Sequence, residues 1–308
     1  MIEITSPPKH FPRKISAGGL STHYRQVGSG PPLVLIHGMM GSLADWQVHI
    51  VPLLTDKFTV LTYDLRGHGY TDMPPSGYTS ADLAGDLVKL LDALAIGQVH
   101  VAGHSLGGQI ALHFTALYPE RVVALTASDT RIRALQPPRK LKDWEKWPLW
   151  NERLSQRGLE LDPEKEMDLT ELDRLIPQRT GPERKASPAR RRKLWRKLLE
   201  STTAKADLAD PAGLTEDLIR QIRIPVQGLF AELSFCMPTL AALRSLLPHL
   251  EAKVLPGVGH FFPVTRPELF AQHIKAFHSS FSTGSSQAAC SDALGEECEM
   301  PPNEEPPA

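Results

Sequence analysis

A serine lies in a sequence context typical of a catalytic nucleophile. Ser105 occupies Gly103-His104-Ser105-Leu106-Gly107, between an apolar run from Val99 to Ala102 and a helix-like stretch from Gln109 to Leu117. A GxSxG pattern between a strand and a helix predicts a sharp turn that exposes the serine hydroxyl above a sheet. A Gly-rich turn can also be only a tight connection, but the flanking elements favour a nucleophile. We therefore expect Ser105 to attack a substrate carbonyl.

A histidine near the end of the ordered pattern suits the role of general base. His260 stands in Gly257-Val258-Gly259-His260, just after the last expected strand. A serine hydroxyl becomes a good nucleophile only when a base removes its proton, and histidine has a suitable pKa. His37, His68 and His104 lie in loop motifs or in the turn itself, so they have simpler structural explanations. We expect His260 to act on Ser105.

Two backbone N–H groups are expected to stabilise the negative oxygen formed by such an attack. Leu106 follows the serine at a helix N-terminus, where its N–H can donate to an oxyanion. Met39 lies in His37-Gly38-Met39-Met40-Gly41-Ser42, directly after the apolar run Leu33 to Ile36. That segment can be an ordinary connection with Ser42 capping the next helix. Together with the serine motif, it favours an oxyanion hole formed by Met39 and Leu106.

Short apolar runs alternate with helix-like stretches, which predicts a parallel sheet flanked by helices. The expected strands are Leu33 to Ile36, Thr59 to Thr62, Val99 to Ala102, Val122 to Ala127, Pro225 to Phe230 and Lys253 to Leu255. The strand pattern is absent from residues 131–222, which we interpret as a helical cap insertion. Residues 20–130 and 223–281 then form the core. The tail at 282–308 has six acidic residues and no Lys or Arg, and is predicted to be disordered.

The motifs and their order resemble those of the α/β-hydrolase fold family. The resemblance covers about residues 20–130 and 222–280, and it depends on HGMMGS at 37–42, DLRGHGYTD at 64–72, GHSLGG at 103–108, YPERV at 118–122 and GVGH at 257–260. It implies an eight-stranded, mostly parallel sheet with a cap inserted after the sixth strand. It also implies that Asp64 and residues 66–69 shape the active-site side of the sheet rather than attack substrate.

The acidic partner of His260 departs from the commonest arrangement of that family. The acid usually follows the seventh strand in a pattern similar to Gly-Glu-x-Asp, whereas Ser234 stands at the expected Asp position here. A serine cannot stabilise an imidazolium as a carboxylate does. Asp129, after the sixth strand, resembles the acid placement of haloalkane dehalogenases, although it can also be structural. Glu232 is the second choice, because it would need a shifted turn, and Asp129 is favoured.

The expected reaction is acyl chemistry on a small-molecule substrate. A serine at the turn excludes the routes that resemble dehalogenases and soluble epoxide hydrolases, which need an Asp ester intermediate there. An ester, thioester, lactone or amide carbonyl remains, cleaved through an acyl-enzyme. The histidines and cysteines never cluster at metal-ligand spacing, and no GxGxxG motif opens a βα unit. We therefore expect no metal and no cofactor.

Composition limits the partners. The net charge is -1 and the pI is about 6.9, so no global field favours nucleic acid or acidic membranes. The three cysteines form no CxxC pair, and neither a signal peptide nor a membrane-spanning run is visible. We expect a soluble, cytoplasmic protein without stable membrane insertion, while the oligomeric state stays open.

The composition of the insertion suggests which class of substrate the protein binds. Residues 131–223 contain 22 Lys or Arg and 16 Asp or Glu, and include Trp144, Trp147, Trp150 and Trp195. This composition suits an apolar acyl or aromatic body that bears a negative group. The simpler explanations are core packing for the tryptophans and a solvated face for the charges.

Other functions stay open on the sequence alone. The same fold can serve as a non-catalytic ligand-binding or receptor protein, and the missing Asp after the seventh strand gives that reading some support. The basic helix and the acidic tail also allow an interaction protein. Serine-dependent acyl transfer and carbon–carbon bond hydrolysis would use the same residues.

Overall fold

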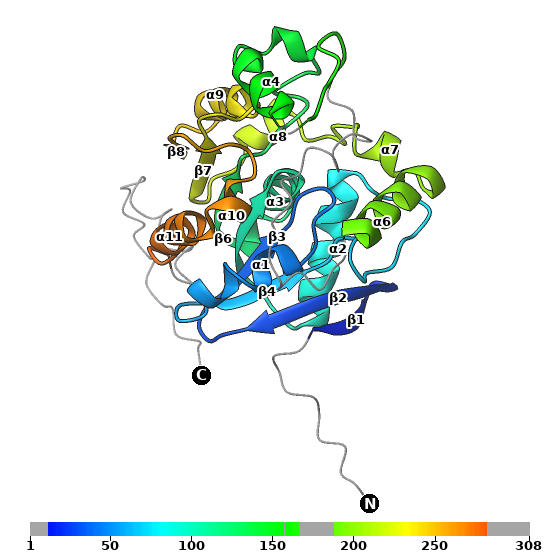
Figure 1. The fold of residues 1–308 in the computed structure, drawn as a ribbon. Helices are drawn as coiled ribbons and strands as arrows, with labels where there is room; N and C mark the ends of the chain where they lie inside the picture. The colour runs from blue at the N-terminus through cyan, green and yellow to red at the C-terminus, as the bar shows by residue number, and fades with distance from the viewer. Residues whose placement is uncertain (1–11, 157, 167–187, 282–308) are drawn as a thin grey trace, which may run out of the picture.

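The computed structural model describes residues 12–156, 158–166 and 188–281. Eight strands form one sheet in the order β1-β2-β4-β3-β5-β6-β7-β8 (Figure 1). Their bounds are β1 Arg13–Ala17, β2 Leu20–Val27, β3 Pro32–Ile36, β4 Thr59–Tyr63, β5 Val99–His104, β6 Val122–Ser128, β7 Val226–Ala231 and β8 Glu251–Leu255. β2 pairs antiparallel with β1 and β4, and every other neighbouring pair is parallel. The predicted mostly parallel, eight-stranded α/β fold is confirmed. The predicted tail at 282–308 lies outside the described residues.

Six strands coincide with the apolar runs of the sequence, while β1 and β2 do not. These two form an antiparallel hairpin at one edge of the sheet, with Ala17 opposite Leu20. Most of their side chains are only partly buried. An edge hairpin needs no continuous apolar run, since much of its surface faces solvent. The sheet therefore begins at Arg13, before the predicted core boundary at residue 20.

Successive residues along a strand point to opposite faces of the sheet, so two hydrophobic layers form. On β3, Val34 and Ile36 join the layer that contains α2 (Ser80–Ala93) and α3 (Leu106–Leu117). Leu33 and Leu35 join the layer that contains Trp46 and the helix α11 (Pro267–His278). Figure 1 shows α11, in orange, and α2, in cyan, on opposite sides of the sheet. The central strand β5, which ends one residue before Ser105, is therefore covered on both faces.

The remaining helices are shorter or lie after β6. They are α1 Ala44–Gln47, η1 Val51–Leu53, η2 Pro119–Arg121, η3 Leu141–Asp143, α4 Trp147–Ser155, α6 Pro188–Ser201, α7 Ala204–Asp207, α8 Glu216–Arg220, α9 Met237–Leu246 and α10 Phe262–Thr265. The described residues between β6 and β7 contain no strand, and none of the described helices is both long and apolar enough to cross a membrane.

The inserted segment does not end where its composition changes. Leu214, Ile219 and Ile222 are at most 1% exposed and pack in the same hydrophobic cluster as the central strands. The sequence predicted an insertion to residue 222, but α8 packs as a part of the core. Its short length and mixed polarity concealed this role, because a single buried side of a five-residue helix gives little periodicity.

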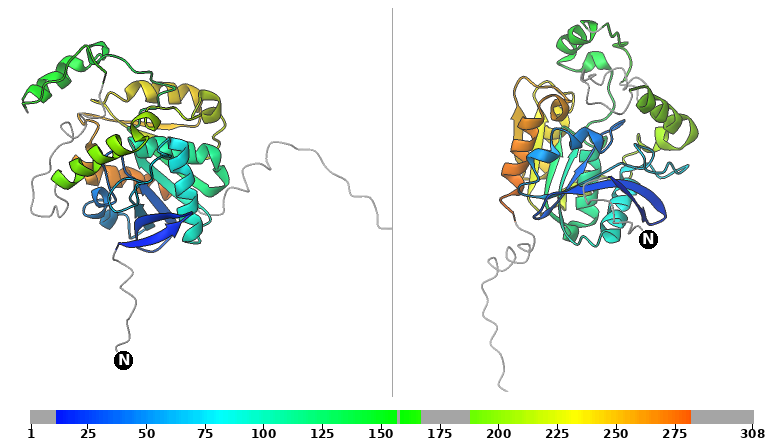
Figure 2. Two further views of the ribbon diagram at one scale, coloured as in Figure 1. Left: turned by 90° about the vertical axis from the view of Figure 1, so that its right-hand side faces the viewer. Right: turned by 60° about the horizontal axis from the view of Figure 1, so that its bottom comes forward.

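Helix α6 contacts the core through a small apolar cluster. Trp195 and Leu198 of α6 pack with Met40 and Tyr78, which follow β3 and β4. The Asp207 carboxylate also accepts a hydrogen bond from the Tyr78 backbone N–H, at 3.0 Å. Figure 2 shows α6, in yellow-green, and α4, in green, as separate helices outside the sheet. The contacts fix α6 beside the loops at the carboxyl ends of the strands.

A buried pair of histidines connects helix α11 to the sheet. The Nδ1 atoms of His100 on β5 and His278 lie 3.2 Å apart, and His278 Nε2 lies 2.9 Å from the Thr126 hydroxyl. Burial lowers the pKa of His100 to about 4 and that of His278 well below its ordinary value. Both rings are therefore neutral at pH 7, and one Nδ1–H donates to the other nitrogen.

We expect acid to destabilise the protein through these rings. Below about pH 6.5 these histidines bind protons in the unfolded state but not in the folded state. The free energy of unfolding that is present above that pH is therefore lost as the pH falls toward 4. Urea unfolding should give a lower free energy at pH 5 than at pH 7, by roughly 2 kcal/mol for His100, whose pKa is about 4, with His278 acting in the same direction. His278→Gln should weaken this pH dependence, whereas His49→Gln, at an exposed position, should not. An unchanged pH dependence in His278→Gln would contradict the role of the pair.

Candidate active site

Three chemically active side chains meet at the carboxyl ends of the parallel strands. Ser105 follows β5, Asp129 follows β6, and His260 lies between β8 and α10. Parallel strands end at one edge of the sheet, which is where sites of such folds form. The residues come from positions up to 155 apart in sequence. The sheet therefore assembles the group that the sequence could only suggest.

The backbone at Ser105 is in a strained conformation, with φ 56° and ψ −119°. Two neighbouring glycines allow this turn. A Cβ atom at Gly103 would overlap the carbonyl of Gly107, and one at Gly107 would overlap the carbonyl of Ile36. The Ser105 carbonyl accepts a bond from the Thr130 hydroxyl at 2.7 Å, and the Ser105 N–H donates to Ser128 at 2.9 Å. These bonds hold the strained serine against relaxation.

Ser105, His260 and Asp129 form a continuous hydrogen-bonded chain. His260 Nε2 lies 3.1 Å from Ser105 Oγ, and His260 Nδ1 lies 2.6 Å from Asp129 Oδ2. A carboxylate only accepts, so Nδ1 bears the proton and donates to Asp129. Nε2 of the neutral ring is then an acceptor, and the Ser105 hydroxyl donates to it. The arrangement can transfer the serine proton to His260.

Asp129 is completely buried, and its two oxygens are well bonded. Besides His260, Oδ2 accepts from the Ser234 hydroxyl at 2.6 Å, and Oδ1 accepts from the Ala231 N–H at 3.0 Å. Its φ of 44° lies in the left-handed region, which places the side chain beside the end of β7. Buried charge requires such partners. Ser234, which stands where the family usually has the acid, serves here as a hydrogen-bond donor to Asp129.

Glu232 contacts a different group. Its Oε2 accepts from the Gly257 N–H at 2.9 Å. Its own N–H donates to Leu255, and its carbonyl accepts from Lys146. Glu232 therefore stabilises the turn that precedes His260, and no hydrogen bond joins it to the imidazole among the described residues. The geometry favours Asp129 over the second-choice acid.

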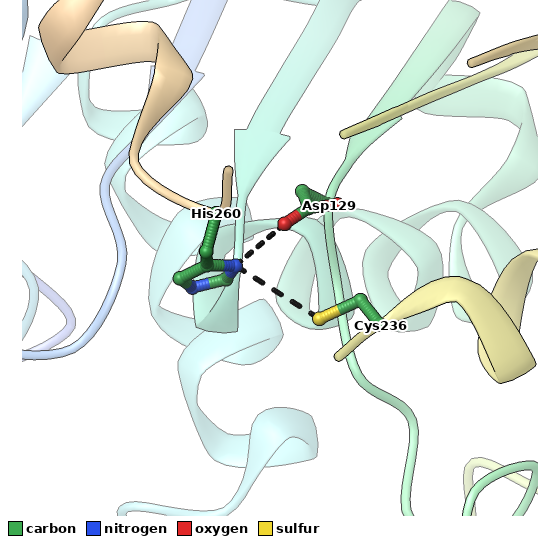
Figure 3. Close-up of side chains that lie close together, drawn as sticks. All are labelled: Asp129, Cys236 and His260. Carbon is green, nitrogen blue, oxygen red and sulfur yellow. Dashed lines mark hydrogen bonds and ion pairs between the residues drawn. The ribbon is translucent and has the colours of Figure 1, made fainter. Parts of the chain in front are cut away.

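Cys236 lies beside the imidazole, which the sequence did not indicate (Figure 3). Its sulfur is 3.9 Å from His260 Nδ1, and the described residues Asp129, Cys236 and His260 are close enough to hold a metal ion. Burial, and then the charge of Asp129, raise the pKa of the Cys236 thiol well above its ordinary value. A cysteine binds a metal as the thiolate, so a metal here would have to displace the thiol proton as well as the Nδ1 proton that His260 donates to Asp129.

The loop after β3 approaches the serine closely. A Cβ atom at Gly38 would lie 3.1 Å from the Ser105 Cβ, so only a residue without a side chain fits comfortably. His37 fixes this loop: its Nδ1–H donates to the Gly38 carbonyl, and its Nε2 accepts from the Leu65 N–H. Burial lowers the pKa of His37, which preserves this neutral form. Met39, the predicted oxyanion donor, is thereby held near Ser105.

A pocket with about 570 Å³ of space, open to solvent, contains Ser105 and His260. Its other lining residues include Met39, Trp46, Phe261 and Val264, so most of its wall is apolar. Leu106, the other predicted oxyanion donor, begins α3 immediately after the serine. An apolar wall beside a few polar groups is typical of a site for a small organic molecule.

His104, next to the serine, has a structural environment. Its ring is buried, its Nε2–H donates to the carbonyl of His260 at 2.8 Å, and its ring centre is 4.9 Å from that of His260. Burial, and then the neighbouring His260, lower the pKa of His104 to about 4. It is therefore neutral at pH 7 and positions the backbone of His260.

Helix α6 contributes a charged residue that sequence reasoning did not single out. Arg191 of α6 lines the pocket and lies 2.8 Å from Asp45. Trp144 and Trp147 instead pack with Leu141 and are at most 8% exposed, as the simpler explanation predicted. Arg191 lies in a run of basic residues, and only the pairing with Asp45, 146 positions away, distinguishes it.

The sheet order and the serine turn define the fold class, and comparison with known proteins identifies the family. A family profile described as alpha/beta hydrolase fold matches residues 31–267. The chain therefore belongs to the alpha/beta hydrolase fold family.

Individual relatives match over shorter stretches. An "Epoxide hydrolase 2" of Siraitia grosvenorii is 37% identical over 131 residues, which cover 42% of each chain. A "2-(acetamidomethylene)succinate hydrolase" of Mesorhizobium japonicum is 36% identical over 121 residues, covering 39% of this chain and 43% of the relative. The chain thus matches about two fifths of the length of these relatives. A solved structure described as a membrane phospholipase A has a TM-score of 0.67 at 24% identity, covering 88% of this chain and 86% of that one, which shows a shared fold.

We expect the proton on His260 Nδ1 to give a low-field NMR resonance that identifies its carboxylate partner. The resonance, assigned by its loss in His260→Gln, should move upfield in Asp129→Asn, because an amide is a weaker acceptor than a carboxylate. Glu232→Gln serves as the matched control and should leave it in place. A resonance that moves in Glu232→Gln and not in Asp129→Asn would contradict the hydrogen bond seen here.

Proposed function

We propose that this protein is a serine hydrolase that cleaves a carboxylic ester, thioester or lactone through an acyl-enzyme intermediate. The observation that carries the proposal is the hydrogen-bonded chain from Ser105 through His260 to the buried Asp129, with distances of 3.1 and 2.6 Å. This is the arrangement of nucleophile, base and orienting acid found in serine hydrolases on unrelated folds. The membership in the alpha/beta hydrolase fold family supports it.

The first half of the reaction forms the acyl-enzyme. Ser105 Oγ attacks the carbonyl carbon while His260 Nε2 accepts the hydroxyl proton. Asp129 stabilises the positive imidazolium through the Nδ1–H bond. The carbonyl oxygen gains negative charge, which the N–H groups of Met39 and Leu106 stabilise. When the tetrahedral intermediate collapses, His260 returns the proton to the leaving alcohol or thiol.

The second half releases the acid. Water enters the site of the departed alcohol, His260 removes one of its protons, and the hydroxide attacks the acyl carbon. The second tetrahedral intermediate collapses, the carboxylic acid leaves, and the proton returns to Ser105. An alcohol in place of water would give acyl transfer, and a carbon leaving group would give carbon–carbon bond hydrolysis, with the same three residues.

The proposed reaction differs from that of the epoxide hydrolases that the chain resembles. A serine that opened an epoxide would form an ether, which water does not hydrolyse, so the enzyme would not turn over. A carboxylate nucleophile forms an ester, which water does hydrolyse. Ser105 therefore supports acyl chemistry, and the relative named as a succinate-derivative hydrolase shows that hydrolysis of other compounds occurs among similar sequences.

We expect hydrolysis of a p-nitrophenyl ester series from acetate to palmitate. Ser105→Ala should lower kcat by about 10³-fold or more, because the nucleophile is lost. Asp129→Asn should lower it by about 10²- to 10⁴-fold, since the imidazolium loses its partner. Glu232→Gln should keep most of the activity, because an amide oxygen still accepts the Gly257 N–H.

Covalent labelling separates this proposal from a non-catalytic receptor. A fluorophosphonate should label the wild-type protein and fail to label Ser105→Ala. A wild-type protein that binds esters but neither releases p-nitrophenol nor reacts with fluorophosphonate would contradict the proposed function.

We also expect no turnover of p-nitrostyrene oxide. At most one equivalent should react, giving an ether on Ser105 that mass spectrometry can locate. Repeated formation of the diol by wild type, lost in Ser105→Ala, would show that the chemistry follows the epoxide-hydrolase relatives instead.

A further inference from the structure

A second pocket adjoins the one that contains Ser105. It encloses about 410 Å³ of space open to solvent, and it lies between α6 of the cap and two core loops. We call it the α6 pocket and define it by Met40, His68, Arg190, Arg191, Leu194 and Trp195. Gly41 and Arg191 line both pockets. The two pockets are therefore adjacent, with Arg191 at their boundary.

The electrostatics of the α6 pocket favour an anion. Arg190 and Arg191 both lie in the first turn of α6, where the helix dipole is positive. Arg190 lies over the Tyr70 ring at 4.1 Å and donates to the Gly69 carbonyl, so it fixes the helix on the core. Arg191 contacts the Asp45 carboxylate. Of the described residues that line the α6 pocket, two are cations and none is a carboxylate.

Arg191 has donors to spare for a ligand. Its bond to Asp45 uses one terminal nitrogen, Nη2, of a group that carries five N–H donors. The two side chains are 22% and 17% exposed, so the charges are partly removed from water and interact more strongly than at an open surface. Asp45 is itself held by the Ser42 N–H at 3.0 Å. The pair therefore keeps the guanidinium in place at the junction of the two pockets.

The α6 pocket also contains an unsatisfied polar atom. His68 is 5% exposed, its Nδ1–H donates to the Arg66 carbonyl at 3.0 Å, and its buried Nε2 has no partner among the described residues. A buried polar atom without a partner is unfavourable unless a ligand group reaches it. Because Nδ1 carries the proton of the neutral ring, Nε2 can only accept, and a hydroxyl group of a ligand or a water molecule would satisfy it. Trp195 and Met40 supply the apolar floor.

From these contacts we propose that the α6 pocket binds the distal carboxylate of the substrate's acyl chain, and that Arg191 is the residue that recognises it. The substrate class would then be monoesters, thioesters or lactones of dicarboxylic acids. This inference rests on the proposed function. The Asp45 carboxylate competes with an anionic ligand for Arg191. It therefore limits how strongly the α6 pocket prefers an anionic chain over a neutral one.

The test compares p-nitrophenyl hemiesters of succinate, glutarate, adipate and suberate with neutral p-nitrophenyl esters of equal chain length. The readout is the ratio of kcat/KM for the anionic ester to that for the neutral ester. Arg191→Met should lower this ratio by about 10- to 100-fold, the range of a charge-assisted hydrogen bond. Arg191→Lys should restore part of it. Arg196→Met, which removes an exposed cation from the same helix, is the matched control and should leave the ratio unchanged.

Asp45→Asn gives the opposite prediction. Removing the competing charge should raise the ratio by about threefold to tenfold, while an asparagine oxygen can still accept the Ser42 N–H. If Arg191 and Asp45 only clamped α6 to the core, both variants would loosen the same contact and change the ratio in the same direction. That result, or equal ratios in wild type and Arg191→Met, would overturn the inference and leave the proposed hydrolase activity intact.

Binding without turnover separates the two proposals. Calorimetry on Ser105→Ala should show that monomethyl glutarate binds more tightly than dimethyl glutarate, and that the difference is lost in Ser105→Ala/Arg191→Met. If no ester is hydrolysed by wild type, the proposed function fails, and this measurement still decides the carboxylate site. Equal affinity for both glutarates in Ser105→Ala would overturn it.

Discussion

A carboxylate with no contact to solvent organises the centre of this protein. Asp129 is completely buried, and a buried charge is stable only when hydrogen bonds replace the water it has lost. Its partners come from three segments: the Ala231 N–H at the end of β7, the Ser234 hydroxyl in the turn that follows, and the His260 ring. The Asp129 carboxylate therefore has all of these hydrogen bonds only when the three segments are in place, and the same hydrogen bonds then hold each segment. The orientation of His260 toward Ser105 is one consequence.

The position of this acid follows from the geometry of the sheet. β6 and β7 are parallel neighbours, with Ser128 opposite Leu229, so their carboxyl ends lie side by side. A carboxylate after either strand can reach the same imidazole. Here the left-handed conformation at Asp129 directs the side chain toward β7, and Ser234 supplies a donor. Ser234, after β7, therefore donates a hydrogen bond to the Asp129 carboxylate and does not supply a carboxylate of its own.

Some parts of this fold and site can be predicted from the sequence, and others cannot. Ser105 and His260 stand in local motifs, because the strained turn requires glycines at fixed spacing and the loop after the last strand has its own pattern. The central strands are buried on both faces and read as apolar runs, whereas the edge strands β1 and β2 do not. The choice between Asp129 and Glu232 depends on a strand pairing across about 100 residues, and local pattern alone cannot show it. Arg191 was even less visible, since it is one of several cations on its helix and acquires its place only through Asp45.

Burial also assigns different proton affinities to the histidines around the site. His37, His68 and His104 are buried, and burial lowers the pKa of each, to about 4 for His68 and His104. They use their ring N–H groups to hold the backbone at Gly38, Arg66 and His260. Of these four neighbouring rings, His260 is the one in direct contact with a carboxylate, which stabilises a positive ring. In the proposed reaction, a proton taken from Ser105 would therefore stay on His260 and would not pass to the rings that maintain the shape of the pocket. His37, His68 and His104 can keep structural roles beside His260 because, among the described residues, none of these three rings is in direct contact with a carboxylate.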